Sequence, residues 1–132
     1  MTEDEMQNYF PTTYPKIFSG KYGGIAVGTG WFDILNSACQ LIQSHCDWQK
    51  EKCPQVVAQQ VKEKFGGLRF YVQGGDEYTQ GIIAMAEMMS GKVCEECGEP
   101  GKTRHGGWIR TLCDRHESER QQKLNERHNN ED

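Results

Sequence analysis

The feature that most constrains this chain is a set of metal-ligand residues in its C-terminal third. The motif reads Cys-x2-Cys, fifteen intervening residues and Cys-x2-His, and its members are Cys94, Cys97, Cys113 and His116. Two residues between ligands let a tight turn direct both side chains at one ion. Four protein ligands fill a tetrahedron, whereas catalytic zinc keeps one position for water. The spacing therefore predicts one structural Zn²⁺ per chain, held by a zinc-ribbon-like module.

The whole chain is predicted to be one small α+β domain. It has 132 residues, of which 36% are apolar, so its core should be lean and the metal should supplement it. Pro11, Pro15 and a run of glycines favour irregular structure near the start. We expect an irregular N-terminal arm over residues 1–23, an α+β core over 24–92, the zinc module over 93–116, and a polar helical or disordered tail over 117–132.

The core is predicted to be a β-hairpin packed on two helices. Apolar residues follow helical spacing over 31–47 and again over 78–90, where they surround most of the helix and predict that it is well buried. Between these segments, alternating apolar residues predict a hairpin over 57–72 that turns at Gly66-Gly67. A short strand is expected at Ile25–Val27, a polar helix from Asp114, and disorder over 128–132.

Charge and hydropathy narrow the classes of function. Lys and Arg total 15 against 19 Asp and Glu, giving a net charge of -4, which argues against a protein that wraps duplex DNA. No stretch approaches the roughly 18 apolar residues of a membrane span, and the acidic start lacks the apolar run of a signal peptide. We therefore expect a cytoplasmic protein without a membrane or nucleic-acid partner.

No catalytic set is recognisable in the sequence. We find no triad, no paired-carboxylate signal and no Walker loop. A zinc deaminase would need His-x-Glu ahead of Pro-Cys-x-x-Cys, whereas Val93 precedes Cys94 and no His-x-Glu occurs. We therefore expect a protein that is not an enzyme.

Three further cysteines, Cys39, Cys46 and Cys53, recur every seven residues. Residues 39 and 46 would lie about 10.5 Å apart along a helix, which is too far for a disulfide. The simpler interpretation is that these cysteines are small, soft residues on a buried helix face. A second metal site that also uses His45 is the alternative.

A glycine pair between cationic and aromatic residues marks a candidate ligand-binding turn. Residues 62–71 read Lys-Glu-Lys-Phe-Gly-Gly-Leu-Arg-Phe-Tyr. Backbone amides in such a turn can form an anion-binding nest, and an arginine can clamp a phosphate through two N–H groups. An ordinary hairpin with a solvated cationic face is the alternative. If basic residues of the zinc loop converge on this turn, the predicted ligand-binding residues are Lys64, Gly66, Gly67, Arg69, Tyr71, Arg104, Trp108 and Arg110.

Three motifs together resemble a known family. They are Gly30-Trp31-Phe32, the Lys-Phe-Gly-Gly-Leu-Arg-Phe-Tyr string and the Cys-x2-Cys…Cys-x2-His unit, and the resemblance covers roughly residues 24–116. The chain resembles small, largely uncharacterised zinc-binding proteins encoded by bacteriophages and prophages. This resemblance implies a phage accessory protein that inhibits or redirects host machinery, including defence systems, in the bacterial host cytoplasm.

These observations support a ranked set of function hypotheses. The first is a non-catalytic anti-defence protein that binds and sequesters a small phosphorylated ligand, such as a signalling nucleotide. The second is a protein-interaction module that docks on a host or phage protein through its acidic surface or its polar C-terminal helix. A nucleic-acid-binding zinc-ribbon regulator comes third, because the net charge does not favour it. The oligomeric state is not predicted.

Overall fold

The N-terminal residues form a helix because they build a complete N-terminal cap. The computed structural model describes residues 1–130, and helix α1 spans Glu3–Thr13. The Thr2 hydroxyl accepts a hydrogen bond from the Glu5 backbone N–H, and the Glu5 carboxylate accepts one from the Thr2 N–H. This reciprocal capping box satisfies two backbone donors that a helix start leaves free. The prediction of an irregular arm over 1–23 is therefore wrong for this stretch, and Pro11 lies inside the helix.

The centre of the fold is a three-stranded sheet. Strand β1 (Ile25–Ala26) pairs in parallel with β2 (Val57–Lys64), which pairs antiparallel with β3 (Gly67–Gln73). The predicted hairpin is confirmed, but its turn lies one residue earlier than predicted. Phe65 and Gly66 form the two-residue loop with φ of 54° and 81°, the pair of positive values that a tight hairpin turn of the primed type requires. The second glycine is therefore the first residue of β3.

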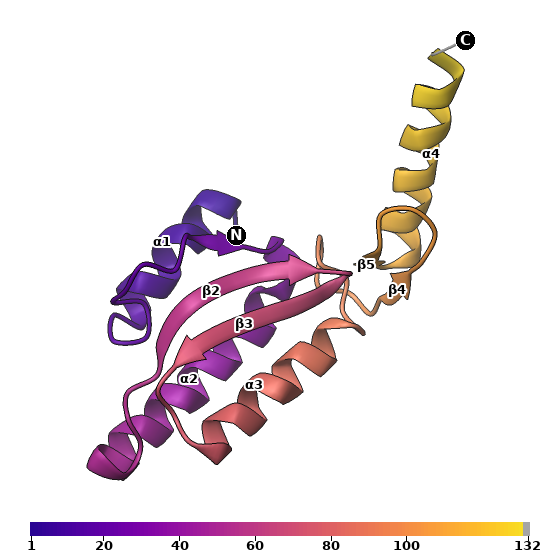
Figure 1. Ribbon diagram of the computed structural model, residues 1–132. Coiled ribbons are helices and arrows are strands. Elements are labelled where there is room, and N and C mark those ends of the chain that lie inside the picture. Colours follow the sequence, from indigo (N-terminus) through magenta and orange to yellow (C-terminus); the bar gives the residue numbers. More distant parts are fainter. Residues whose placement is uncertain (131–132) are drawn as a thin grey trace.

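Two antiparallel helices lie side by side along the sheet (Figure 1). Helix α2 (Phe32–Gln49) follows a short 3₁₀ turn, η1 (Thr29–Trp31), and leads into a second one, η2 (Lys50–Lys52). Helix α3 (Glu77–Ser90) begins at an Asp76 cap. Both helices match the sequence prediction, and β3 and α3 pack directly on each other.

The main core lies between the helices, the sheet and the N-terminal segment. Trp31 is fully buried, and its indole N–H donates to the Val93 carbonyl at 2.8 Å. Helix α1 is joined to α2 because the hydroxyls of Tyr9 and Tyr14 both donate to the Asn36 side-chain oxygen, at 3.0 and 2.6 Å. The largest fully buried apolar side chains are Trp31, Phe10, Met6, Ile17, Leu35, Ile42, Leu68, Leu112, Val56 and Val61.

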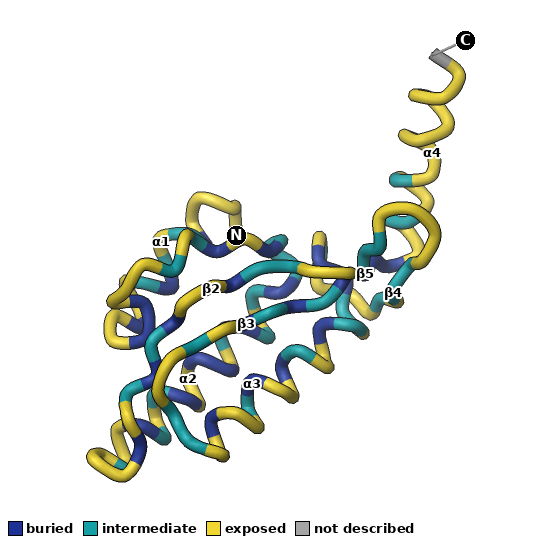
Figure 2. Tube along the Cα trace, in the orientation of Figure 1, coloured by how far each residue is buried: buried dark blue, intermediate teal, exposed yellow. Residues whose placement is uncertain are grey.

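Helix α3 is less buried than the sequence predicted. Ile83 and Ala86 face the core, but Met85 and Met89 are exposed. No other helix within residues 1–130 covers the outward face of α3. Exposed and buried residues alternate along this helix in Figure 2. Its apolar residues therefore serve two surfaces, one facing the core and one facing solvent.

The C-terminal third forms a separate small layer. Strands β4 (Lys102–Arg104) and β5 (Arg110–Leu112) pair antiparallel, and helix α4 (Asp114–Asn130) projects away from the body of the protein (Figure 1). Most of α4 is exposed, as Figure 2 shows. The predicted polar helix is confirmed. Disorder was predicted over 128–132, but residues 128–130 continue α4, and 131–132 lie outside the described residues. No helix within residues 1–130 is both long and apolar enough to cross a membrane.

Candidate functional site

The four predicted metal ligands converge on one point in the C-terminal layer. The ligand atoms of Cys94, Cys97, Cys113 and His116 all lie within 4.8 Å of one another. The Sγ atoms of Cys97 and Cys113 are 3.8 Å apart, and Nδ1 of His116 lies 3.2 Å from Cys113 Sγ and 3.5 Å from Cys94 Sγ. Ligands at about 2.0–2.3 Å from a tetrahedral ion have separations of about 3.5–3.8 Å. The four side chains therefore form a site of the right size for one metal ion.

Local turns bring each pair of ligands together. In the first pair, the Gly98 N–H donates to the Cys94 carbonyl at 2.9 Å, and Gly98 has φ of 83°, which glycine adopts without strain. In the second pair, the backbone N–H of His116 donates to Cys113 Sγ at the start of α4. This hydrogen bond lowers the pKa of Cys113 to about 7, which favours the thiolate that a metal requires. Burial raises the pKa of Cys97 to about 11.

A carboxylate orients the histidine ligand. Nε2 of His116 lies 3.3 Å from a carboxylate oxygen of Glu96. Because Nδ1 faces the cysteines, the ring hydrogen belongs on Nε2 and is donated to Glu96. Such an outer partner fixes the tautomer and the orientation of a metal-bound histidine. The other oxygen of Glu96 accepts from Arg110 at 3.1 Å, so its carboxylate is itself held in place.

The metal-ligand layer docks on the core through a close backbone approach. The Gly30 N–H donates to the Glu95 carbonyl at 2.8 Å. A Cβ at Gly30 would lie 2.2 Å from the Cys94 carbonyl oxygen, so a larger residue does not fit. The buried Glu95 carboxylate accepts from the Gly28 N–H at 2.9 Å and lies 3.7 Å from the Arg110 guanidinium. Burial raises the pKa of Glu95 despite these contacts.

The hairpin tip, which was predicted to bind an anion, makes internal contacts. The Gly66 N–H donates to the Glu63 carboxylate at 2.7 Å, and the Gly66 carbonyl accepts from the Thr111 hydroxyl at 2.6 Å. A Cβ at Gly66 would lie 3.2–3.3 Å from side-chain atoms of Ile109, Thr103 and Thr111. The tip therefore packs tightly on β4 and β5, and the amide proposed to cradle a phosphate already has an acceptor.

The other predicted ligand-binding residues of the hairpin lie along strands β2 and β3. Arg69 and Tyr71 alternate with the buried residues of β3 and project to the opposite face, as predicted. The Arg69 guanidinium donates to the Leu68 carbonyl at 3.1 Å. Lys64 and Gly67 face each other across the hairpin at the ends of β2 and β3.

The two predicted arginines of the metal layer already face carboxylates. The guanidinium of Arg104 lies 2.8 Å from the Asp114 carboxylate, and that of Arg110 lies 3.1 Å from Glu96. Trp108, on the loop between β4 and β5, is 77% exposed. The structure thus brings the hairpin tip to the metal layer, but both of these cations are engaged by acidic residues of the same layer.

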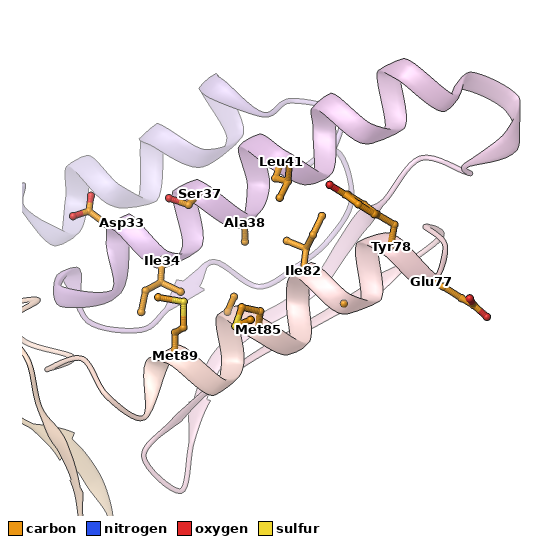
Figure 3. Close-up of a pocket in the computed structure, with 12 residues that line it drawn as sticks. Asp33, Ile34, Ser37, Ala38, Leu41, Glu77, Tyr78, Ile82, Met85 and Met89 are labelled. Carbon is orange, nitrogen blue, oxygen red and sulfur yellow. The ribbon is translucent and has the colours of Figure 1, made fainter.

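A surface groove between α2 and α3 is a feature that sequence analysis missed. Its volume is about 630 Å³, and most of its lining is apolar. In Figure 3, Ile34 and Met89 meet near one end, while Leu41 and Tyr78 lie toward the other. The groove is lined by Asp33, Ile34, Ser37, Ala38, Leu41, Glu77, Tyr78, Gly81, Ile82, Met85, Ala86 and Met89.

The outward face of α3 has fewer polar residues than an ordinary surface helix. The helix carries two charged residues, Glu77 and Glu87, and the Glu87 carboxylate accepts from the Phe70 N–H at 2.9 Å on β3. Apolar residues on all sides of a segment were interpreted as a sign of burial. A helix that binds a partner has the same pattern of few polar residues. This pattern was therefore the sequence signal of the groove.

No family model, curated protein or solved structure matches this chain. The resemblance to phage-encoded zinc proteins accordingly stays a hypothesis. The function is argued below from the two features that the structure provides, the metal-ligand cluster and the groove.

We predict that Glu96→Gln weakens metal binding about 10- to 100-fold, the usual effect of losing an outer-shell carboxylate. The glutamine has nearly the same shape but does not carry the charge that orients His116. Competition with a chelator of known affinity measures the change. Glu99→Gln is the control, because the Glu99 side chain is exposed and only its backbone carbonyl contacts the site, by accepting from the Cys94 N–H. Equal affinities for all three proteins would contradict the role of Glu96.

We predict that Gly30→Ala lowers the free energy of unfolding by about 1–3 kcal/mol, the range for overpacking a tight contact. The added methyl group would meet the Cys94 carbonyl oxygen. Gly81→Ala is the control, because a Cβ at this position in α3 meets no atom within 4 Å. That change should raise stability by about 0.5–1 kcal/mol. Urea unfolding measures both, and a neutral Gly30→Ala would show that the layers do not dock as described.

Proposed function

We propose that this chain is a non-catalytic protein-interaction module that carries a structural zinc ion in its C-terminal layer and binds an amphipathic helix of a partner protein in the α2–α3 groove. The observation that carries the proposal is the exposed apolar face of α3. A partner from the host or the phage is consistent with the resemblance to phage accessory proteins.

Zinc is the ion that best suits the metal site. Three thiolates and one imidazole are a typical donor set for tetrahedral Zn²⁺, and soft sulfur ligands disfavour Mg²⁺ and Ca²⁺. The ligand atoms of Cys94, Cys97, Cys113 and His116 lie close enough to share one ion. Since all four positions would be filled by protein, the ion's role is to stabilise the C-terminal layer.

The groove has the surface chemistry of a binding site. Leu41, Tyr78, Met85 and Met89 line the groove and are 45%, 53%, 60% and 47% exposed, although each is large and apolar. A monomeric protein seldom exposes apolar side chains together in one patch, and such patches mark interaction sites. Methionine is common on surfaces that accept a partner helix because its side chain is flexible and polarisable.

The shape and the charges of the groove favour a helix with basic ends. Helix α3 has 14 residues, so the groove runs along about 21 Å, the length of four helical turns. Asp33 lies at the end near Ile34 and Met89, and Glu77 lies at the other end (Figure 3). A bound helix would place apolar residues at i, i+3, i+4 and i+7 into the groove and basic residues near the two carboxylates.

The same charges argue against a second copy of this chain as the occupant. If two copies paired through their grooves with α3 antiparallel, Glu77 of each would approach the Asp33 end of the other. A parallel pairing would place each acidic residue beside its own counterpart. Both arrangements bring like charges together across an apolar interface, which is unfavourable.

Several contacts favour the interaction module over sequestration of a phosphorylated ligand. The Gly66 amide, Arg104 and Arg110 all have carboxylate partners within the chain. Cys39 and Cys53 are buried, and burial raises the pKa of each thiol, which disfavours the thiolate that a nucleophile would need.

We predict that Met85→Glu weakens groove binding while the protein stays folded. A display library of random 16-residue peptides would be selected for binding to the wild-type protein. The affinities of the enriched peptides would then be measured by fluorescence anisotropy. Their sequences should show apolar residues at helical spacing with Lys or Arg at both ends. Met85→Glu should weaken binding at least tenfold, which corresponds to about 1.4 kcal/mol, because it places a charge in the apolar lining.

Gln80→Glu is the matched control, since it adds the same charge to an exposed position of α3 outside the groove lining. It should bind the selected peptides as the wild type does. Enriched peptides that bind Met85→Glu equally well would contradict the proposal. A wild-type dimer in sedimentation velocity that Met85→Glu dissociates would show instead that a second copy fills the groove. Stoichiometric binding of a nucleotide in calorimetry, lost in Arg69→Ala, would favour the phosphorylated-ligand hypothesis.

A further inference from the structure

A second group of metal-ligating side chains lies at the opposite end of the helix pair from the zinc site. Its members come from three elements: His45 and Cys46 from the last turns of α2, Cys53 from the residue after η2, and Asp76 from the N-cap of α3. The ligand atoms of His45, Cys53 and Asp76 lie within 4.8 Å of one another. Cys46 Sγ lies 3.5 Å from Cys53 Sγ but not within 4.8 Å of all three of these ligand atoms, so it would move toward them to bind the same ion.

We propose that His45, Cys46, Cys53 and Asp76 form a second metal site, which takes Zn²⁺ or another divalent ion that prefers nitrogen and sulfur. The inference is independent of the proposed groove function. Two thiolates, one imidazole and one carboxylate make a four-coordinate donor set, and each of these groups is a known zinc ligand. Cys39, the remaining cysteine of the seven-residue series, lies about two helical turns before Cys46 on α2 and is not one of the proposed ligands.

The distance between the two thiols fits ligands of one ion. Two sulfur atoms at about 2.3 Å from a tetrahedral ion are about 3.8 Å apart, whereas a disulfide has a length of about 2.05 Å. The 3.5 Å between Cys46 and Cys53 is close to the 3.8 Å between Cys97 and Cys113 in the first site. Both pairs therefore have the spacing of shared metal ligands.

The histidine and the aspartate would move apart slightly to bind the ion. Nε2 of His45 lies 2.7 Å from Asp76 Oδ2, a hydrogen-bond distance. Nitrogen and oxygen ligands at about 2.0–2.2 Å from one ion are about 3.3 Å apart, so ion entry replaces this hydrogen bond by two metal–ligand bonds. Asp76 Oδ1 accepts from the Thr79 N–H at 3.0 Å, so the cap of α3 is kept.

Proton release accompanies binding at this site. Cys46 and Cys53 each lose a thiol proton to solvent, and the neutral imidazole of His45 keeps its one hydrogen on the nitrogen that does not bind the ion. The ion would join the end of α2 to the start of α3. The His45 ring also stacks on Tyr78 at 4.2 Å, so the site adjoins the Tyr78 end of the groove.

Metal stoichiometry of the full chain tests this proposal. Wild type purified under reducing conditions and equilibrated with excess Zn²⁺ should hold two ions per chain in native mass spectrometry. Cys53→Ser and Asp76→Asn should each hold one. Asp76→Asn is the safer variant, because asparagine caps a helix as well as aspartate does and the fold is thereby kept. Cys39→Ala, which removes a buried cysteine outside both clusters, should retain two ions.

Cobalt provides a second readout, because thiolate-to-Co²⁺ charge-transfer absorption reports sulfur ligation directly. Cys97→Ser, which removes a ligand of the first site, should keep one Co²⁺ with a thiolate band that the further change Cys53→Ser removes. One ion per wild-type chain at saturation would overturn the proposal. Two ions retained in Asp76→Asn and Cys53→Ser would also overturn it, as would a Cys46–Cys53 disulfide in reductively purified protein.

Discussion

The convergence of four side chains that can share one metal ion is the feature on which the C-terminal third depends. Strands β4 and β5 have three residues each, and the buried cluster of this layer consists of Cys94, Leu112 and Cys113. So little apolar surface does not fold a segment on its own, and an ion bound by the four ligands would supply the missing folding free energy. The layer in turn supports the hairpin tip through the Thr111–Gly66 hydrogen bond and packs on Gly30. The cluster of metal-ligand residues, the packed hairpin tip and the docked backbone thus form one connected structure.

The apolar residues of the chain serve two different purposes. Those of α2 and the sheet enclose the core, whereas those on the outward face of α3 line the groove with Leu41 and Ile34. Charged residues show the same division. The arginines beside the metal ligands pair with acidic residues of the same layer, whereas the α2–α3 face exposes apolar side chains to solvent. A structural ion in the C-terminal layer and a binding surface between α2 and α3 would account for both the paired arginines and the exposed apolar residues.

The sequence predicted those parts of the structure that depend on local spacing. The metal ligands, the two core helices and the hairpin follow from residues close together in the chain. The start of α1 was missed because Pro11 and nearby glycines were weighed above the capping box of Thr2 and Glu5. The hairpin turn was placed one residue late because Phe65 adopts a positive φ that was assigned to glycine.

The remaining misses concern partners that lie far apart in the chain. Arg110 and the Gly66 amide looked available for an anion, because the sequence does not show that Glu96 and Glu63 reach them. Periodicity also counts the apolar residues of α3 without showing whether another element covers them. The second cysteine group was considered from its seven-residue spacing, but Asp76 belongs to another element and could not be included.

Hydrogen exchange measured by mass spectrometry on wild type and Cys97→Ser, both in zinc-containing buffer, tests the central claim most directly. The account holds that the metal organises the C-terminal layer and that the core with its groove folds independently of it. In Cys97→Ser, backbone amides over residues 93–116 should lose their protection, while those of β2, β3, α2 and α3 keep most of theirs. Unchanged protection over 93–116 would contradict the account, and so would a uniform loss across the whole chain.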